Sequence, residues 1–200
     1  MDTIELKIGG FGGQGIILSG LIIGKAAALF DKRHSVMTQS FGPEARGSAC
    51  SSQVIISENR ILYPYVTRPN ILVVMSQEAY TKFSPLLDPE GTLLYESELI
   101  ELGKLPPCAR RAGIPCTRIA EELGRRIVAN IVMLGFFASQ TEAVTREAMR
   151  KAIEDSVPKG TEKLNLNAFE RGYTYGLSDT KQSPVGMGAG SGHESRLIIR

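Results

Sequence analysis

The sequence predicts an α/β protein, a three-layer α/β/α domain whose sheet is mostly parallel and contains one hairpin. Strand-like apolar segments alternate with helical patterns along the 200 residues, as they do in α/β proteins. A glycine-rich turn joins the first of these strands to the first helix. We therefore expect one domain over residues 1–176, which is long enough to bury a sizeable core, and a tail after it.

The first unit of the chain is a strand, a glycine turn and a helix. Ile4, Leu6 and Ile8 alternate with polar or small residues, which is typical of a strand with one buried face. The apolar, alanine-rich run over residues 16–30 has the length of a helix. Between the two lie four glycines within six positions, and the whole turn consists of Gly10, Phe11, Gly12, Gly13, Gln14 and Gly15.

The glycine turn is suited to the binding of an anion. Gly10, Gly12 and Gly15 have the G-x-G-x-x-G spacing; glycine lets a ligand approach the backbone, and the helix start offers free N–H groups. Nicotinamide binding also requires an acidic residue at the end of the second strand. Residues 34–39 form that strand and run into Ser40, with no acidic residue at their end. A site for phosphate or another anion, a nicotinamide site, and glycines that only pack the helix on the strand stay open as alternatives.

The rest of the chain continues the alternation. Asn130 lies in the apolar half of the longest predicted helix, which belongs at the centre of the domain or against a partner subunit. Asn130 must find a hydrogen bond there, because an unpaired buried amide costs about 1–3 kcal/mol. Glu58 and Asn59 form the turn of the hairpin. Strands are predicted over residues 48–57, 60–63, 71–75, 92–95 and 114–117, and helices over residues 77–87, 118–139, 145–155 and 162–173.

Composition and charge exclude several classes of protein. The net charge of +2 is too small to indicate nucleic acid or an acidic membrane surface as the partner. No secretory signal opens the chain, and the apolar run over residues 16–30 contains Lys25 and is too short to span a bilayer. The 3 cysteines form no C-x-x-C pair and only 2 histidines accompany them, so we expect no metal or cluster site on this chain. These features predict a cytoplasmic protein.

The composition changes after Gly176. Residues 183–192 consist largely of glycine and serine, and a segment of such low complexity cannot bury a core. We therefore expect residues 177–200 to form a flexible tail; a loop that winds into another subunit is the alternative.

A second loop with chemically useful side chains covers residues 38–47. Because it follows the second strand, it should lie at the same carboxyl edge of the sheet as the glycine turn. Arg46 is suited to clamp a phosphate or carboxylate with two hydrogen bonds; the alternative is an ion pair with Glu44 or with a partner chain. The sequence predicts no catalytic residue, and the candidate cofactor-binding residues are Gly10, Gly12, Gly13, Gln14, Gly15, Ser40, Glu44, Arg46 and Gly47.

These two loops resemble the paired signatures of the gamma subunit of 2-oxoacid:ferredoxin oxidoreductases, most of all those of the 2-oxoglutarate enzymes (2-oxoglutarate synthases). The resemblance spans about residues 4–176 in order. It continues through residues 61–64, 69–75, 130–135 and 167–169 and through Gly172. It is therefore much more specific than the glycine spacing alone.

The resemblance implies a subunit that is active only within an enzyme complex. Such a complex oxidatively decarboxylates a 2-oxoacid with coenzyme A, giving an acyl-CoA, CO2 and reduced ferredoxin. Thiamine diphosphate, Mg2+ and 4Fe–4S clusters are implied for the alpha, beta and, where present, ferredoxin-like delta subunits, with coenzyme A as co-substrate. This chain would complete the complex and shape the approach of substrate and coenzyme A. A stand-alone NAD(P)-dependent oxidoreductase and a purely structural assembly subunit are the alternatives.

Overall fold

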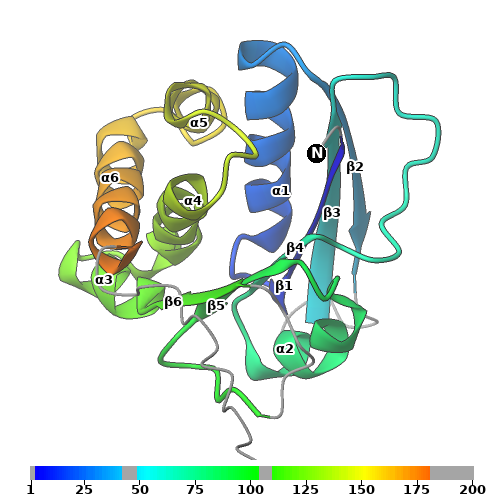
Figure 1. Cartoon of the computed structure of the whole chain (residues 1–200). Helices are drawn as coiled ribbons and strands as arrows, with labels where there is room; N and C mark the ends of the chain where they lie inside the picture. Colours follow the sequence, from blue (N-terminus) through cyan, green and yellow to red (C-terminus); the bar gives the residue numbers. More distant parts are fainter. Residues whose placement is uncertain (1–2, 42–48, 104–109, 181–200) are drawn as a thin grey trace, which may run out of the picture.

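A six-stranded sheet forms the middle layer of the molecule, with its strands in the order β2-β3-β1-β4-β5-β6 (Figure 1). The computed structural model describes residues 3–41, 49–103 and 110–180. β1, β4, β5 and β6 run parallel, whereas β3 is antiparallel to both of its neighbours, β1 and β2. The predicted α/β fold with a mostly parallel sheet is thus confirmed. The strands are β1 (Thr3–Phe11), β2 (His34–Ser40), β3 (Ala49–Ser57), β4 (Ile71–Val74), β5 (Thr92–Glu96) and β6 (Arg110–Ile114).

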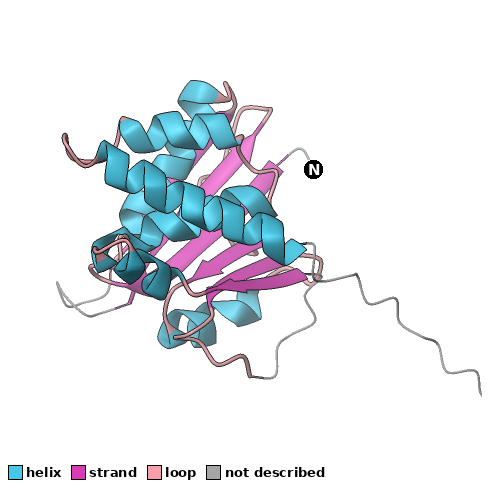
Figure 2. Cartoon of the chain, turned by 90° about the vertical axis from the view of Figure 1, so that its left-hand side faces the viewer, coloured by secondary structure: helices cyan, strands magenta, loops and turns pink. Residues whose placement is uncertain are grey.

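Helices cover both faces of the sheet. The alternation of side chains in β4 shows why: Ile71 and Val73 belong to the larger core cluster, whereas Leu72 and Val74 pack with the helix on the opposite face. Figure 2 looks onto the larger helical layer, with the sheet behind it. That layer contains α1 (Ile16–Lys25), a π-helical turn that continues it (Ala26–Phe30), α3 (Cys116–Glu122), α4 (Ala129–Gln140), α5 (Arg146–Glu154) and α6 (Glu162–Thr180), and α2 (Gln77–Phe83) covers the other face.

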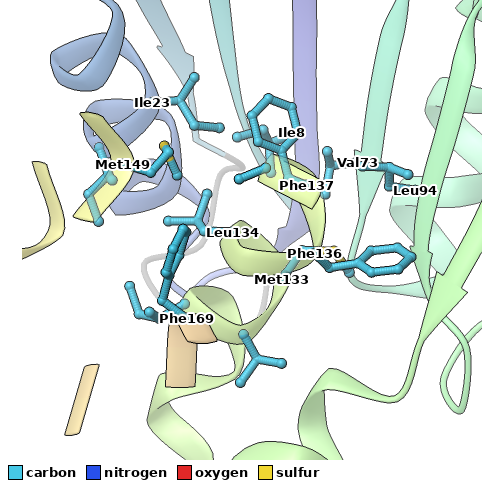
Figure 3. Close-up of a cluster of buried hydrophobic side chains, with 14 of the residues drawn as sticks. Ile8, Ile23, Val73, Leu94, Met133, Leu134, Phe136, Phe137, Met149 and Phe169 are labelled. Atoms are coloured by element: carbon cyan, nitrogen blue, oxygen red, sulfur yellow. The ribbon is translucent and has the colours of Figure 1, made fainter. Parts of the chain in front are cut away.

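Helix α4 forms the centre of the core. It is buried along almost its whole length, and Figure 3 shows its Leu134 and Phe137 in one cluster with Ile8 of β1 and Phe169 of α6. A Cβ on Gly135 would stand 1.9 Å from the carbonyl oxygen of Phe169, so the two helices touch through their backbones. Of the two places predicted for this apolar segment, the centre of the domain is the one observed.

The predicted return strand over residues 60–63 is wrong. β3 is paired with β1 on one side and with β2 on the other, along its whole length. A strand that follows β3 therefore finds no free edge beside it. The hairpin of this sheet is formed by β2 and β3, and residues 58–70 connect β3 to β4 outside the sheet.

Three predicted element boundaries also differ from the structure. The helix predicted over residues 118–139 is divided into α3 and α4, because Gly124 adopts a φ of +82° just after α3. β6 ends at Ile114 and α3 begins at Cys116, so the strand predicted over residues 114–117 lies too far along the chain. With 19 residues, α6 is the longest helix of the described ranges; residues 177–180 continue it, and residues 181–200 lie outside those ranges. None of the described helices is long and apolar enough to cross a membrane.

Candidate binding site at the carboxyl edge of the sheet

The side chain of Gln14 holds the glycine turn in shape. Its Oε1 accepts a hydrogen bond from the N–H of Phe11 (2.7 Å), and its Nε2 donates to the carbonyl oxygen of Met75, just beyond β4 (3.0 Å). Gln14 therefore links the ends of two neighbouring parallel strands. Since both ends of its amide are engaged within the chain, Gln14 braces the turn and leaves ligand contacts to the backbone around it.

The glycines of the turn divide into two groups. Gly10 and Gly15 are needed for packing: a Cβ on Gly10 would stand 2.6 Å from Gln14 Oε1, and one on Gly15 would stand 2.4 Å from Asn130 Nδ2. Gly12 and Gly13 are exposed. Gly13 has a φ of +97°, yet a Cβ there would meet no atom within 4 Å. The outward face of the turn is therefore open backbone.

Helix α4 is hydrogen-bonded to the end of the glycine turn. The carbonyl oxygen of Gly15 accepts hydrogen bonds from Ser19 Oγ (3.0 Å) and from Asn130 Nδ2 (3.4 Å). Asn130 is buried in the first turn of α4, so the prediction that it must find a hydrogen bond is confirmed. The bond fixes the position of α4 relative to the start of α1.

A pocket of about 280 Å³ opens beside the glycine turn. β1 leads into α1 on one face of the sheet and β4 leads into α2 on the other face, and ligands of α/β proteins bind at such a topological switch point. The Arg126 side chain is 71% exposed, and its Nε lies 3.8 Å from Glu121 Oε1. Ile127 is 78% exposed. The pocket is lined by Gly13, Gln14, Met75, Thr117, Arg126, Ile127 and Ala129.

Larger hollows occur elsewhere on the described surface. One of about 530 Å³ lies between α3 and α6, one of about 740 Å³ lies beside α2, and one of about 500 Å³ lies at the amino edge of the sheet. None of these three hollows is lined by the glycine turn. Position at the switch point, and not size, makes the smaller pocket the candidate site.

A buried carboxylate fixes the wall of the pocket that α3 provides. Glu96 is fully buried at the end of β5. Its Oε2 accepts hydrogen bonds from the Cys116 thiol (2.7 Å) and from the N–H and the hydroxyl of Thr117 (both 2.8 Å). Burial, together with the neighbouring Glu96 carboxylate, raises the pKa of the Cys116 thiol well above its ordinary value. Cys116 is therefore a protonated donor that helps to orient Glu96 and, through it, Thr117.

The loop predicted to share this edge begins where expected. β2 runs parallel to β1 across β3, with Ser40 opposite Ser51 and Ser51 opposite Gly9. Ser40 is exposed and lies two strand spacings, about 10 Å, from Gly9. Glu44, Arg46 and Gly47 lie outside the described residues, so their binding roles stay predictions.

The strand arrangement does not favour the nicotinamide alternative. In a dinucleotide-binding fold the second strand lies directly beside the first and ends in an acidic residue. Here β3 separates β2 from β1, and β2 ends at Ser40. Among the described residues, no three His, Cys, Asp or Glu side chains form a group that could hold a metal ion.

Several pocket residues were not found from the sequence. Thr117, Arg126 and Ile127 belong to no recognisable motif, and Met75 ends the segment 69–75 of the family resemblance without any signal that it lies at the site. The one available signal was Gly124, which ends α3 and brings the short 3-10 turn Arg126–Val128 to the edge.

Comparisons with known proteins agree on one family. Residues 5–175 match the family model described as pyruvate ferredoxin/flavodoxin oxidoreductase. The chain is 52% identical over 171 residues to 2-oxoglutarate synthase subunit KorC of Methanocaldococcus jannaschii, covering 84% of this chain and 91% of that protein. It is 34% identical over 173 residues to ketoisovalerate oxidoreductase subunit VorA of Methanothermobacter thermautotrophicus, covering 84% of this chain and 35% of that longer protein. The solved gamma subunit of a keto/oxoacid ferredoxin oxidoreductase from Geobacter sulfurreducens matches with a TM-score of 0.76 and 38% identity, over 88% of this chain and 99% of that chain.

Proposed function

The chain belongs to the pyruvate ferredoxin/flavodoxin oxidoreductase family, and from this premise we propose that it is the gamma subunit of a 2-oxoglutarate:ferredoxin oxidoreductase. The observation that carries the proposal is the 52% identity with a 2-oxoglutarate synthase subunit over 91% of that protein's length. The family model matches residues 5–175, a range that includes the glycine turn, the pocket and the helical core. The chain is thus a subunit of an oxidoreductase complex.

The complex converts 2-oxoglutarate and coenzyme A to an acyl-CoA and CO2, and ferredoxin receives the electrons. Thiamine diphosphate and Mg2+ on the alpha and beta subunits supply the carbanion chemistry, and 4Fe–4S clusters on the partner subunits conduct the electrons. A ferredoxin-like delta subunit completes the assembly where it is present. The family resemblance supports this division of labour between the subunits.

The role of this chain is to hold coenzyme A at the carboxyl-edge pocket. The start of α1 carries a partial positive charge and free N–H groups. Gly12 and Gly13 are exposed, a Cβ on Gly13 would meet no atom within 4 Å, and Arg126 adds a cation. These features suit the phosphate groups of coenzyme A. The sequence predicts further contacts from the neighbouring loop, at Arg46, Ser40, Glu44 and Gly47. Gly10, Gln14 and Gly15 keep the glycine turn in shape.

Isolation of the complex tests the assignment. The tagged chain is purified from its native cells under anaerobic conditions, and the eluate is assayed for reduction of a viologen dye with 2-oxoglutarate or pyruvate, with and without coenzyme A. We expect brown partner subunits to co-elute and the dye to be reduced with 2-oxoglutarate only when coenzyme A is present. A chain that elutes alone and binds NAD(P) would contradict the assignment, and a pyruvate-specific eluate would correct the substrate.

A further inference from the structure

The wall that α3 gives to the carboxyl-edge pocket is built on a buried carboxylate whose hydrogen-bond donors are neutral. Glu96 is fully buried at the end of β5. Its Oε1 accepts the N–H of Glu98 (3.2 Å), and its Oε2 accepts the thiol of Cys116 and both the N–H and the hydroxyl of Thr117. The negative charge of Glu96 therefore lies directly behind the Thr117 side chain, which lines the pocket.

The direction of the hydrogen bond between Thr117 and Glu96 follows from these contacts. Both oxygens of Glu96 accept an N–H bond, Oε2 from Thr117 and Oε1 from Glu98, so the group acts as an acceptor. The Thr117 hydroxyl consequently donates its proton to Oε2 (2.8 Å) and keeps its oxygen lone pairs. Within the described ranges no other group hydrogen-bonds to that oxygen. Thr117 thus offers the pocket an acceptor and no donor.

The two walls of the pocket have opposite preferences. On the side of the glycine turn, the start of α1 and the Arg126 cation attract an anion such as a phosphate. On the side of α3, the charge of Glu96 repels an anion, and the Thr117 oxygen can pair only with an N–H or O–H group. A molecule that fits both walls carries a phosphate and, beside it, a neutral hydrogen-bond donor.

We propose that the Thr117 hydroxyl accepts a hydrogen bond from a neutral N–H or O–H group of coenzyme A, and that this bond fixes how coenzyme A lies in the pocket. The inference rests on the proposed function and adds a specificity-determining residue to it. Coenzyme A has such donors on both sides of its pyrophosphate. The pantetheine arm has amide N–H groups and a hydroxyl, and the adenosine has an amino group and a ribose hydroxyl.

Equilibrium binding to the intact complex tests the proposal. Thr117→Val replaces the hydroxyl by a methyl group of similar size. The anaerobically purified complexes are titrated in a calorimeter, without a 2-oxoacid, with coenzyme A and with two phosphate-bearing fragments of it, 4′-phosphopantetheine and adenosine 3′,5′-bisphosphate. We expect Thr117→Val to bind coenzyme A about three- to tenfold more weakly, because one neutral hydrogen bond is lost. One fragment should be weakened by a similar factor and the other left unchanged, and the weakened fragment identifies the side that carries the donor.

Two further variants serve as controls. Thr117→Ser keeps the hydroxyl and should bind all three molecules as the wild type does. Arg118→Ala changes the next residue of α3, whose exposed side chain pairs with Glu98 (2.9 Å) and does not line the pocket, and it should also bind as the wild type does. Unchanged binding in Thr117→Val, equal weakening of both fragments, or weakened binding in Thr117→Ser would overturn the proposal.

The complex should assemble with Thr117→Val, because Glu96 keeps its bonds from Cys116, from Glu98 and from the N–H of residue 117. Thr117→Ala carries the same comparison if it does not. A wild-type complex that binds no coenzyme A, or one in which Arg126→Ala leaves that binding unchanged, contradicts the proposed role of the pocket. Binding that depends on Arg126 but not on the Thr117 hydroxyl contradicts the present inference alone.

Discussion

Gly13 and Gly15 both adopt a left-handed backbone, but only Gly15 has a neighbour where a Cβ would stand. An alanine in that conformation costs about 1–2 kcal/mol for the backbone alone. At Gly15 the added methyl group must also displace Asn130, which is hydrogen-bonded to the Gly15 carbonyl oxygen. The two positions therefore separate the cost of the conformation from the cost of the packing.

We expect Gly15→Ala to lower the free energy of unfolding by about 2–5 kcal/mol, because overpacking adds about 1–3 kcal/mol to the backbone cost of about 1–2 kcal/mol. Gly13→Ala should cost about 1–2 kcal/mol. Urea unfolding of the purified chain, followed by circular dichroism, gives both values. Equal losses from the two variants would contradict the close packing of Asn130 on Gly15.

The thiol of Cys116 makes stability depend on pH in the alkaline range. Its pKa is raised in the folded chain, so the folded thiol keeps its proton at a pH where the unfolded thiol, with a pKa of about 8.5, has lost it. The resulting stability is fully present below the unfolded pKa. It is lost as pH rises above that value, by up to about 1.4 kcal/mol per pH unit.

We therefore expect Cys116→Ala to be less stable than wild type at pH 7.5, because Glu96 loses a donor. The difference between the two proteins should shrink as the pH rises from 7.5 to 9.5. The free energy of unfolding of both chains, measured in urea under reducing conditions across this range, checks the expectation. A difference that is constant with pH would show that the folded thiol titrates normally.

Single residues were predicted from the sequence only where the reason is local. Asn130 stood out because it is an amide in an apolar helix, and its need for a partner was met. The role of Gln14 could not be foreseen, because Met75, which accepts its hydrogen bond, lies 61 residues further along the chain.

The pairing of α4 with α6 depends on glycines at the contact. A Cβ on Gly135 would stand 1.9 Å from the Phe169 carbonyl oxygen, and one on Gly172 would stand 1.9 Å from the Val132 carbonyl oxygen. Backbone atoms cannot move aside as a flexible side chain can. The helices would have to separate, and the apolar cluster between them and the sheet would lose its close packing.

We expect Gly135→Ala to lower the free energy of unfolding by about 3 kcal/mol or more, although alanine is the better helix former. Gly103→Ala is the matched control, because a Cβ at Gly103 meets no atom within 4 Å, and it should change stability by less than about 0.5 kcal/mol. Thermal and urea unfolding of both variants measure these changes in the free energy of unfolding. A neutral Gly135→Ala would mean that α4 and α6 are not in backbone contact.

Elements with a strong local pattern were predicted well, and those decided by the neighbours in the sheet were not. β1, β4 and the start of α5, where Thr145 Oγ1 accepts from the N–H of Ala148 (3.1 Å), follow directly from periodicity and capping. Residues 60–63 have a strand-like composition, but both edges of β3 are already paired. Strand pairing is a property of the whole sheet, so the composition of one segment could not decide it.

The sheet as a whole brings the glycine turn and the start of the second predicted loop, at Ser40, to one edge. That outcome was foreseeable from the order of strands and helices, because strands that run in the same direction end at the same edge. The pocket itself was not foreseeable, since Thr117 is positioned by Glu96 of β5 and Arg126 reaches the pocket only through the break between α3 and α4 at Gly124. The sequence thus located the edge of the sheet at which the candidate pocket lies, and the structure added the wall opposite the glycine turn.

We propose that this carboxyl-edge pocket binds coenzyme A in the assembled enzyme. The Michaelis constant for coenzyme A, measured by dye reduction with the purified complex, tests it most directly. Arg126→Ala is the informative variant: the Arg126 side chain is 71% exposed, so its loss should leave the fold intact. Arg125→Ala is the control, because Arg125 is the neighbouring residue and is also exposed. Arg46→Ala tests the neighbouring loop in the same assay.

A charged contact to a phosphate is worth about 1.5–3 kcal/mol, so Arg126→Ala should raise the Michaelis constant for coenzyme A about tenfold or more. The constant for 2-oxoglutarate should stay unchanged, as should both constants in Arg125→Ala. Unchanged constants in Arg126→Ala and in Arg46→Ala, with a lower yield of complex, would contradict the claim and leave the pocket a part of the subunit scaffold.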